Sequence, residues 1–253
     1  MREQTHRFHS SVLGNERPLW IRRSPGTHLP LLILLDGEVY REEMDVFSCL
    51  EELEEGGRIP PSLTVLVSRH SPARRWVECP CHPPFAAFIR DELLPWLESR
   101  FDLASDPARR IVGGASYTGL AAAYAALESG GRLGRVLSQS GAFWAEDGAF
   151  LHLLEERPAA PLRFHLEVGN AETQAPLEHR PDVVQKESQL AVNRRLRDLL
   201  QRKGYAVDYR EIAEGTHHPN SWRSALPTLL AAVLQPTADD SPDDTGTGLR
   251  GVS

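Results

Sequence analysis

The stretch "RRIVGGASYTGLAAAYAALESG", residues 109–130, decides the fold of this chain. An apolar strand runs into Ser116, and a helix of small residues follows at once. This pattern is close to G-x-S-x-G, in which a serine nucleophile sits on a sharp turn between a buried strand and a helix. The match is incomplete, because Thr118 stands at the last glycine position and Gly119 comes one residue later. A serine that merely caps an ordinary helix is the alternative interpretation.

Strand and helix patterns alternate on both sides of this segment. Units of this kind predict an α/β protein with a mostly parallel central sheet and helices on both faces. The segment 17–23 is a candidate for an antiparallel edge strand. Strands are predicted at 29–37, 63–68, 134–141, 162–170 and 205–213, and helices at 85–101 (with a kink at Pro95), 188–204 and 224–234.

The length and composition are those of one globular domain. The chain has 253 residues, of which 41% are hydrophobic and 25% charged. Residues 1–235 carry the alternating pattern, and we expect them to form a single domain. Residues 236–253 contain almost no bulky apolar side chains, so we expect a disordered tail.

Charge and cysteine content narrow the partners and the compartment. The 28 Lys and Arg against 35 Asp and Glu leave a net charge of −7, which argues against nucleic acid or an anionic membrane as the main partner. The sequence shows neither a transmembrane span nor a signal peptide, so we expect a cytoplasmic location. The three cysteines fit a reducing compartment, and the Cys79–His82 stretch matches no usual zinc spacing. We therefore expect no metal.

Candidate partners for Ser116 lie beyond two later strands. A serine hydroxyl needs a base to take its proton, and the base needs a carboxylate to orient it. In α/β-hydrolases the order along the chain is serine, acid, histidine. Glu172 follows the strand at 162–170, with Asp182 as the second choice. His217 and His218 follow the last strand, and we favour His217 as the base.

An oxyanion intermediate also needs backbone donors. The position after the nucleophile supplies one, which here is the N–H of Tyr117. The second comes from the loop after the first central strand, where Gly37 and Glu38 are the candidates. An ordinary Asp-Gly turn is the alternative interpretation of that loop.

With these residues assembled, the chain resembles the catalytic domain of the enterochelin (enterobactin) esterases, within the esterase D-like group of α/β-hydrolases. The similarity runs from about Pro30 to Leu234. It is carried by ordered blocks, which are "LLILLDGE", "RWVECPCHPPFAAFIRDELLPWL", "DPARRIVGGASYTGLAAAYAAL", "GRVLSQSGAFW", "LEVGNAE" and "EGTHHPNSWRSAL". Two departures stand out. Thr118 replaces the usual glycine and is expected to weaken activity or narrow the pocket. With about 30 residues before the sheet, we expect no counterpart of the family's additional amino-terminal domain.

The resemblance implies roles for named residues. Ser116 becomes the nucleophile, His217 the general base and Glu172 the acid. It also implies that four residues contact the substrate. These are Arg75 and Glu78 of an R-x-x-E pattern, and Trp222 and Arg223 of an H-x-x-x-x-W-R pattern that begins at His217.

The implied reaction is cofactor-free hydrolysis of a small-molecule carboxylic ester. For a siderophore esterase this would be a serine-based catecholate trilactone or linear ester, free or iron-loaded. Three alternatives stay open. They are a general acyl or carbohydrate esterase of the same fold, an acyltransferase that shares the acyl-enzyme, and a non-catalytic binding protein. The oligomeric state is not indicated.

Overall fold

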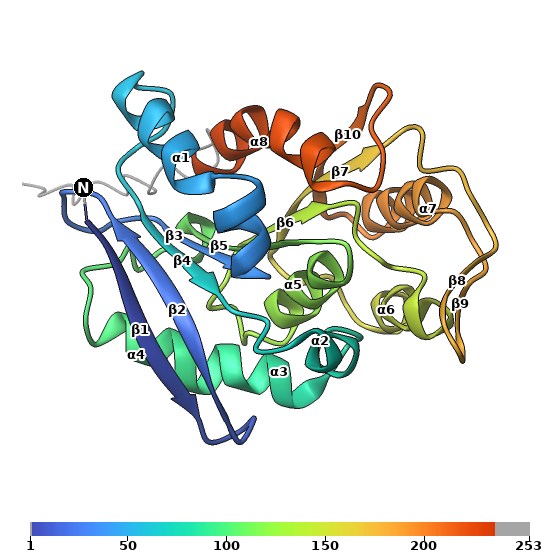
Figure 1. Cartoon of the computed structure of the whole chain (residues 1–253), viewed down its shortest axis with the longest axis horizontal. Helices are drawn as coiled ribbons and strands as arrows, with labels where there is room; N and C mark the ends of the chain where they lie inside the picture. Colours follow the sequence, from blue (N-terminus) through green and yellow to red (C-terminus); the bar gives the residue numbers. More distant parts are fainter. Residues whose placement is uncertain (1, 236–253) are drawn as a thin grey trace, which may run out of the picture.

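The structure is a computed structural model that describes residues 2–235 (Figure 1). Its centre is one eight-stranded sheet with the order β1-β2-β4-β3-β5-β6-β7-β10, and a separate hairpin is formed by β8 and β9. The strands are β1 (Arg2–Ser10), β2 (Asn15–Arg23), β3 (Leu31–Leu35), β4 (Leu63–Val67), β5 (Arg110–Ala115), β6 (Arg135–Gln139), β7 (Arg163–Gly169), β8 (Leu177–Arg180), β9 (Val183–Gln185) and β10 (Ala206–Ile212).

Helices lie between the parallel strands along the chain, and a last helix follows the final strand. They are α1 (Val46–Glu55), α2 (Pro72–Glu78), α3 (Pro83–Ala87), α4 (Leu94–Glu98), α5 (Tyr117–Leu127), α6 (Ala145–Glu156), α7 (Gln189–Arg202) and α8 (Pro219–Leu234). Two π-helical turns (Val39–Glu43 and Phe88–Leu93) and a 3₁₀ turn (Pro107–Arg109) complete the set. Among residues 2–235 there is no helix with the length and apolar character needed to span a bilayer.

The sheet is mostly parallel, as predicted. Strands β4, β3, β5, β6, β7 and β10 pair in parallel. β2 pairs antiparallel with β4 and with β1. The predicted edge strand at 17–23 is therefore the second strand of the sheet, and β1 forms the edge. The sequence pattern did not indicate β1, because its polar and charged residues outnumber its apolar ones.

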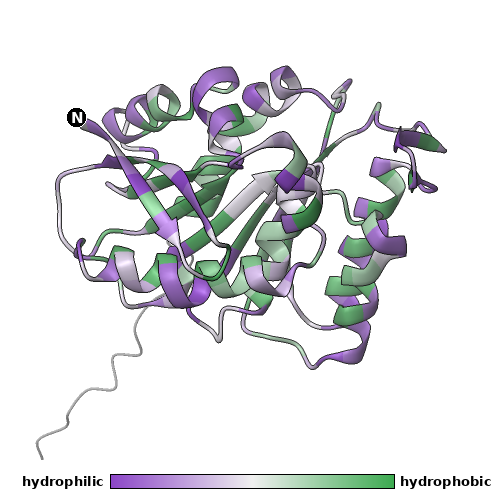
Figure 2. Ribbon diagram, turned by 60° about the horizontal axis from the view of Figure 1, so that its bottom comes forward, coloured by the Kyte–Doolittle hydropathy of each residue, from purple (hydrophilic) through white to green (hydrophobic). Residues whose placement is uncertain are grey.

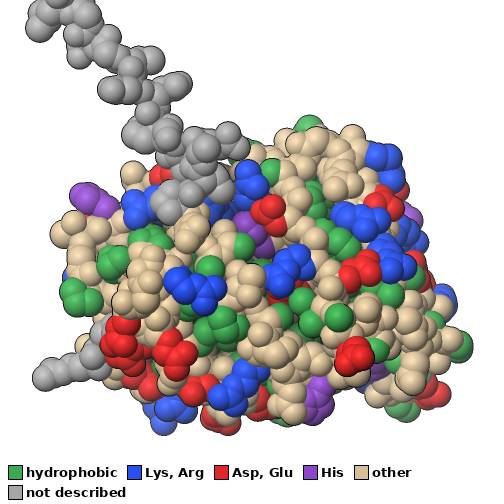
Figure 3. Space-filling model, turned by 90° about the horizontal axis from the view of Figure 1, so that it is seen from above, with side chains coloured by type: hydrophobic (Ala, Val, Ile, Leu, Met, Phe, Trp, Pro, Cys, Tyr) green, Lys and Arg blue, Asp and Glu red, His purple; other side chains and the backbone are tan. Residues whose placement is uncertain are grey.

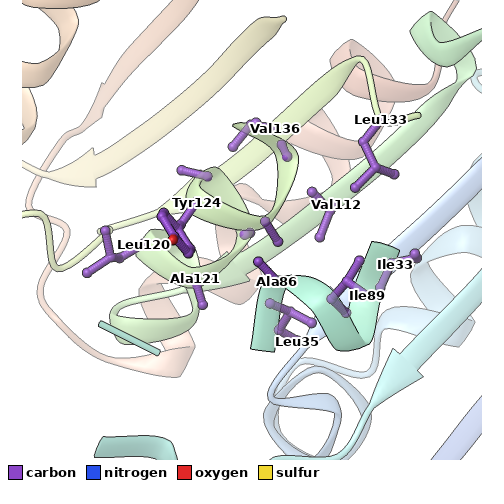
Figure 4. Packing of buried hydrophobic residues seen from close by; sticks show 14 of the residues in the cluster. Ile33, Leu35, Ala86, Ile89, Val112, Leu120, Ala121, Tyr124, Leu133 and Val136 are labelled. Atoms are coloured by element: carbon purple, nitrogen blue, oxygen red, sulfur yellow. The ribbon is translucent and has the colours of Figure 1, made fainter. Parts of the chain in front are cut away.

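Alternate residues of the central strands bury against different helices. On β3, Leu31, Ile33 and Leu35 belong to the larger core cluster, whereas Leu32 and Leu34 belong to the smaller one. The larger cluster packs β3 and β5 against α3 and α5, and Figure 4 labels Ile33, Val112, Ala86 and Leu120, one from each of these elements. The smaller cluster lies beneath α1 and α8. Apolar residues concentrate in the central strands and polar ones on the outer helix faces (Figure 2).

Most predicted elements are present with shifted bounds. The helix predicted at 85–101 is α3, a π-helical turn and α4 in succession. Leu94 N–H bonds to the carbonyl of Ile89, one residue further back than in an α-helix, just before Pro95, which has no N–H. Helix α8 begins at Pro219, earlier than predicted. A single domain over 1–235 stays a prediction, and the predicted disordered tail, 236–253, lies outside the described residues.

Candidate active site

Three neighbouring strands end in sharply turned residues. Asp36 follows β3, Ser116 follows β5 and Ser140 follows β6, with φ values of 59°, 57° and 48°. Such conformations cost a non-glycine residue about 1–3 kcal/mol and gather at functional sites. The carboxyl edge of the parallel strands is also where ligands bind in open α/β sheets. The turns therefore mark this edge as the place of the candidate site.

Ser116 is held in its turn by backbone bonds and close packing. Its N–H donates to the carbonyl of Gln139 at 2.8 Å, and its carbonyl accepts from the N–H of Ala142 at 3.0 Å. A Cβ atom on Gly114 would lie 2.4 Å from the carbonyl oxygen of Thr118, and one on Gly119 would lie 2.5 Å from Ser138 Oγ. Only glycine fits at these two positions, which lets the strand and the helix approach closely.

Thr118 does not narrow the pocket, contrary to one expectation from the sequence. Its side chain is buried and faces the end of β5. Its Oγ1 donates to the carbonyl of Ala115 at 2.8 Å and accepts from the N–H of the same residue at 3.1 Å. The hydroxyl therefore satisfies backbone groups at the elbow, and the side chain is not part of the cavity wall.

Serine, histidine and carboxylate form a continuous hydrogen-bonded line. His217 Nε2 lies 3.0 Å from Ser116 Oγ, and His217 Nδ1 lies 2.6 Å from Glu172 Oε2. The Glu172 side chain is 2% exposed and that of His217 is 42% exposed. A carboxylate at Nδ1 holds the proton of a neutral imidazole on that nitrogen, so Nε2 is free to accept the proton of Ser116.

Two tied loops bring the histidine and its acid together. Glu172 follows β7 and His217 follows β10, which are neighbours in the sheet. The N–H of Ala171 donates to the carbonyl of Gly215 at 3.0 Å. A Cβ atom on Gly169 would lie 2.2 Å from that same carbonyl oxygen. The two loops can approach this closely because a glycine stands on each side of the contact.

The hydrogen-bonded line of Ser116, His217 and Glu172 borders a cavity of about 420 Å³ with aromatic walls. Trp76 packs edge to face on Tyr117 at 4.7 Å between ring centroids, and Trp144 does the same at 5.5 Å. His179 of β8 stacks on Trp144 at 4.9 Å with 4° between the ring planes. The cavity therefore offers flat π surfaces within reach of Ser116. Amides of Gln174, Gln185 and Gln189 also line it.

Arg75 supplies a positive charge beside the elbow. Its Nε lies 2.6 Å from Asp36 Oδ2, and its Nη2 donates to the carbonyl of Ala115 at 3.4 Å. The guanidinium lies 5.6 Å from the centre of the Tyr117 ring. Burial raises the pKa of Asp36, and the adjacent Arg75 opposes that shift. Arg75 lines the cavity, as its predicted role in substrate contact requires.

The predicted oxyanion donors lie at two helix starts. Tyr117 is the first residue of α5, where an amide N–H has no acceptor within the helix. Gly37 and Glu38 follow β3 but are not among the residues that line the cavity. The Glu38 carboxylate accepts from Ser68 Oγ and from the N–H of Arg69. The role of Tyr117, Gly37 and Glu38 as oxyanion donors stays a prediction.

Three predicted substrate contacts lie off the cavity wall. Glu78 is 3% exposed and bonds to the guanidinium of Arg17. Trp222 lies edge-on to the His217 ring at 5.2 Å and is outside the cavity lining. Arg223 is 57% exposed at its side chain, 4.0 Å from Asp45. None of the three is among the residues that line the cavity, and their role in substrate contact stays a prediction.

The second choices from the sequence also lie away from Ser116. His218 caps α8, where its Nδ1 accepts from the N–H of Asn220 at 3.2 Å. Asp182 is exposed in the turn between β8 and β9. The structure thus brings His217 and Glu172, and neither alternative, to the serine.

Sequence reasoning missed the aromatic wall of the cavity. Trp76 stands inside the R-x-x-E pattern and Trp144 ends "LSQSGAFW", so both lay within quoted blocks without being singled out. His179 comes from the β8–β9 hairpin, which no periodic pattern indicates. Ser140, in the turn after β6, bonds to Glu172 and was also missed.

The cysteine-rich stretch shows no metal arrangement. Across residues 2–235, no three His, Cys, Asp or Glu side chains are grouped as metal ligands. Burial raises the pKa of Cys81 to about 12, and it raises that of Cys79 as well. Both thiols are therefore protonated at neutral pH and are poor ligands or nucleophiles.

The fold and the site together define an α/β-hydrolase with a serine–histidine–carboxylate arrangement. The chain belongs to the family described as putative esterase, whose model matches residues 10–233. The iron(III) enterobactin esterase of Dickeya dadantii is 34% identical over 224 residues, which cover 86% of this chain and 51% of that protein. The Escherichia coli K12 enzyme of the same name is 30% identical over 242 residues, which cover 91% of this chain and 57% of that protein. The chain thus spans just over half the length of these relatives.

Solved structures agree. The enterochelin esterase of Shigella flexneri has a TM-score of 0.81 at 29% identity, and the match covers 93% of this chain and 59% of the Shigella chain. The enterobactin esterase of the same organism, in the presence of enterobactin, has a TM-score of 0.80 at 28% identity, with coverages of 92% and 58%. A serine hydrolase of Shewanella oneidensis, at 23% identity and TM-score 0.75, shares the fold over 92% of this chain and 80% of its own.

Proposed function

We propose that this chain is a serine esterase that hydrolyses carboxylic esters of a catecholate siderophore through an acyl-enzyme. The observation that carries the proposal is the line from Ser116 through His217 to Glu172, which opens into an aromatic cavity. The enterobactin esterase relatives support the substrate class. We also propose a cytoplasmic location, because the three free cysteines fit a reducing compartment.

The geometry gives each triad member one task. His217 Nε2 takes the proton as Ser116 Oγ attacks the ester carbonyl carbon, and Glu172 stabilises the imidazolium that forms. The Tyr117 N–H and the loop at Gly37 are proposed to stabilise the oxyanion. His217 then gives its proton to the leaving alcohol. In the second half, His217 takes a proton from water as the water attacks the acyl-enzyme, and Ser116 regains its hydroxyl.

The cavity suits an aromatic, electron-rich acyl group. Trp76, Trp144 and His179 offer faces and edges to a flat ring. Arg75 adds a cation to the cavity lining, which favours an anionic catecholate. These features favour a dihydroxybenzoyl-serine ester over the general acyl or carbohydrate ester of the alternative interpretation.

The first test is covalent labelling with a fluorophosphonate, followed by intact-mass measurement. We expect a single adduct on the native chain and none on Ser116→Ala, because only a serine activated by His217 attacks the probe quickly. Folded protein without an adduct would remove the esterase proposal and leave the ligand-binding alternative.

The second test separates the substrate classes. We expect kcat/KM for a linear dihydroxybenzoyl-serine ester to exceed that for an aliphatic ester of the same alcohol by about tenfold or more, since ring stacking and a charge contact each contribute about 1 kcal/mol. Equal values would point to a general acyl esterase. Product analysis with an added alcohol would reveal an acyltransferase.

A further inference from the structure

Ser140 lies beneath the catalytic acid in a fixed hydrogen-bonded chain. It is completely buried in the turn after β6. Its Oγ lies 2.6 Å from Glu172 Oε1 and 3.0 Å from Trp222 Nε1. An indole nitrogen can only donate, and a hydroxyl has one proton. The direction is therefore set: Trp222 donates to Ser140, and Ser140 donates to Glu172.

The hydrogen bonds to Glu172 Oε1 leave its other carboxylate oxygen, Oε2, for His217. Glu172 Oε1 accepts from Ser140 Oγ and from the N–H of Gly169, the latter at 2.8 Å. Glu172 Oε2 accepts from His217 Nδ1. Donors on Oε1 stabilise the charged carboxylate and fix its plane. Ser140 thus influences both the orientation and the basicity of the group that faces His217.

Trp222 contacts the same system from the other side. Its ring stands at 87° to the His217 ring, with 5.2 Å between centroids. Its carbonyl accepts from Gln139 Nε2 at 3.1 Å, which anchors the first turn of α8 to the end of β6. One side chain therefore touches the imidazole with its ring edge and reaches the carboxylate through Ser140.

We propose that Ser140 and Trp222 are positioning residues that hold Glu172 and His217 in line and set the pH at which His217 becomes an active base. This role is distinct from the substrate contact that the family resemblance implies for Trp222. The inference rests on the proposed esterase function, because it concerns the same site.

Other charged groups face this network. The Glu167 carboxyl, on β7, lines the same small internal space as Ser140 and Trp222. Burial raises its pKa to about 7, against the opposing effect of Arg210, whose Nη1 lies 3.2 Å from Oε1. Arg75 and His179 line the main cavity on the side of Ser116. A pH profile must therefore separate His217 from Glu167, which Glu167→Gln does.

The main test is the pH profile of kcat/KM for Ser140→Ala. Without the Ser140 donor, the Glu172–His217 pair takes up its proton at higher pH. We expect the acid limb to move up by about one pH unit, since a hydrogen bond to a charged group is worth about 1.5–3 kcal/mol. At pH 7 we expect kcat to fall about tenfold while KM stays within about threefold.

Matched variants isolate each contact. Trp222→Phe keeps a ring beside His217 but removes the N–H, so we expect a smaller shift in the same direction. Ser138→Ala is the control, because Ser138 is a buried serine on β6, two residues before Ser140, and its Oγ has no hydrogen-bond partner among the described residues. It should leave the limb unmoved. Glu167→Gln should retain the acid limb of the kcat/KM profile. If the acid limb disappears in Glu167→Gln, the limb belongs to Glu167 and the proposal is overturned.

A measurement without turnover keeps the two proposals separable. The titration of His217, followed by NMR on protein with ¹⁵N-labelled histidine, should have its midpoint at higher pH in Ser140→Ala than in the native chain. If the native chain neither labels nor hydrolyses esters, the proposed function fails while this titration still tests the positioning role. An unchanged midpoint in folded Ser140→Ala would refute the positioning role.

Discussion

Thr118 stands where a glycine would complete the G-x-S-x-G motif, and its hydroxyl replaces missing sheet bonds. The pairing of β5 with β3 ends at Gly113. Ala115 lies beyond that point, and its N–H and carbonyl both bond to Thr118 Oγ1. The threonine is therefore a structural substitute at the elbow, and a small residue is not the only solution there.

Replacing this hydroxyl should destabilise the elbow. Thr118→Val has nearly the same shape but leaves the buried N–H of Ala115 without its acceptor, so we expect the free energy of unfolding to fall by about 1–3 kcal/mol. Thr118→Ser keeps the hydroxyl and should lose less than about 1 kcal/mol. Urea denaturation of the pair measures the difference. Equal losses would show that the hydroxyl bonds contribute nothing.

At the scale of elements, β7 carries two buried titratable side chains with opposite pH effects. Glu167 and His165 are each 2% exposed. Burial raises the pKa of Glu167 to about 7 and lowers that of His165 to about 4. Between pH 4.5 and 7, folded Glu167 holds a proton that the unfolded chain releases, so stability falls as pH rises. Between pH 4 and 6.5, His165 has the opposite effect, and the two offset each other.

Glu167→Gln should reveal the pH dependence of stability that Glu167 contributes. We expect its free energy of unfolding, relative to the native chain, to increase from pH 4.5 to 8 by about 3 kcal/mol, because the native chain loses stability between pH 4.5 and 7 as the unfolded chain releases the proton that folded Glu167 holds. Urea denaturation at both pH values measures this. A constant difference between variant and native chain would mean that Glu167 does not titrate in this window.

The β8–β9 hairpin is the element that the sequence pattern did not indicate. It packs beside α6 and α7 at the end of the molecule away from β1 (Figure 1). It contributes His179 to the cavity and exposes Leu177 and Val184. A short hairpin outside the main sheet thus supplies one wall of the site.

At the scale of the whole molecule, a buried ion pair joins the antiparallel end of the sheet to the cavity wall. Arg17 of β2 is fully buried, and its Nη2 lies 3.1 Å from both oxygens of Glu78, the last residue of α2. Helix α2 carries Arg75 and Trp76 of the site.

The face seen in Figure 3 mixes acidic, basic and apolar side chains, so it offers no extended patch of one charge.

Breaking this pair should cost more than removing it. Glu78→Leu leaves the Arg17 charge buried and unpaired, and we expect the free energy of unfolding to fall by about 3–5 kcal/mol. The double variant Arg17→Met with Glu78→Leu should recover most of that loss. Urea unfolding of the native chain, both single variants and the double variant gives the coupling energy. Additive losses in the double variant would contradict the paired-charge explanation.

Much of the fold and of the site was predictable from local patterns. Continuous apolar runs mark strands buried on both faces, and their alternation with helices requires a mostly parallel sheet. Ser116, Glu172 and His217 stand at strand ends in the order of the class. Local patterns along the chain therefore establish the α/β class, the elbow and the residue types of the triad, because these features depend on neighbours in the sequence.

Only the tertiary structure decided the choices that depend on distance. Ser116 and His217 are 101 residues apart, and Glu172 and His217 are 45 apart. Their contact, and the exclusion of His218 and Asp182, follow from the sheet order and from the loops tied at Gly169 and Gly215. The same geometry places Trp222 against the His217 ring and Glu78 in a buried ion pair with Arg17. A sequence pattern states which groups are present, whereas their partners depend on how distant strands pack.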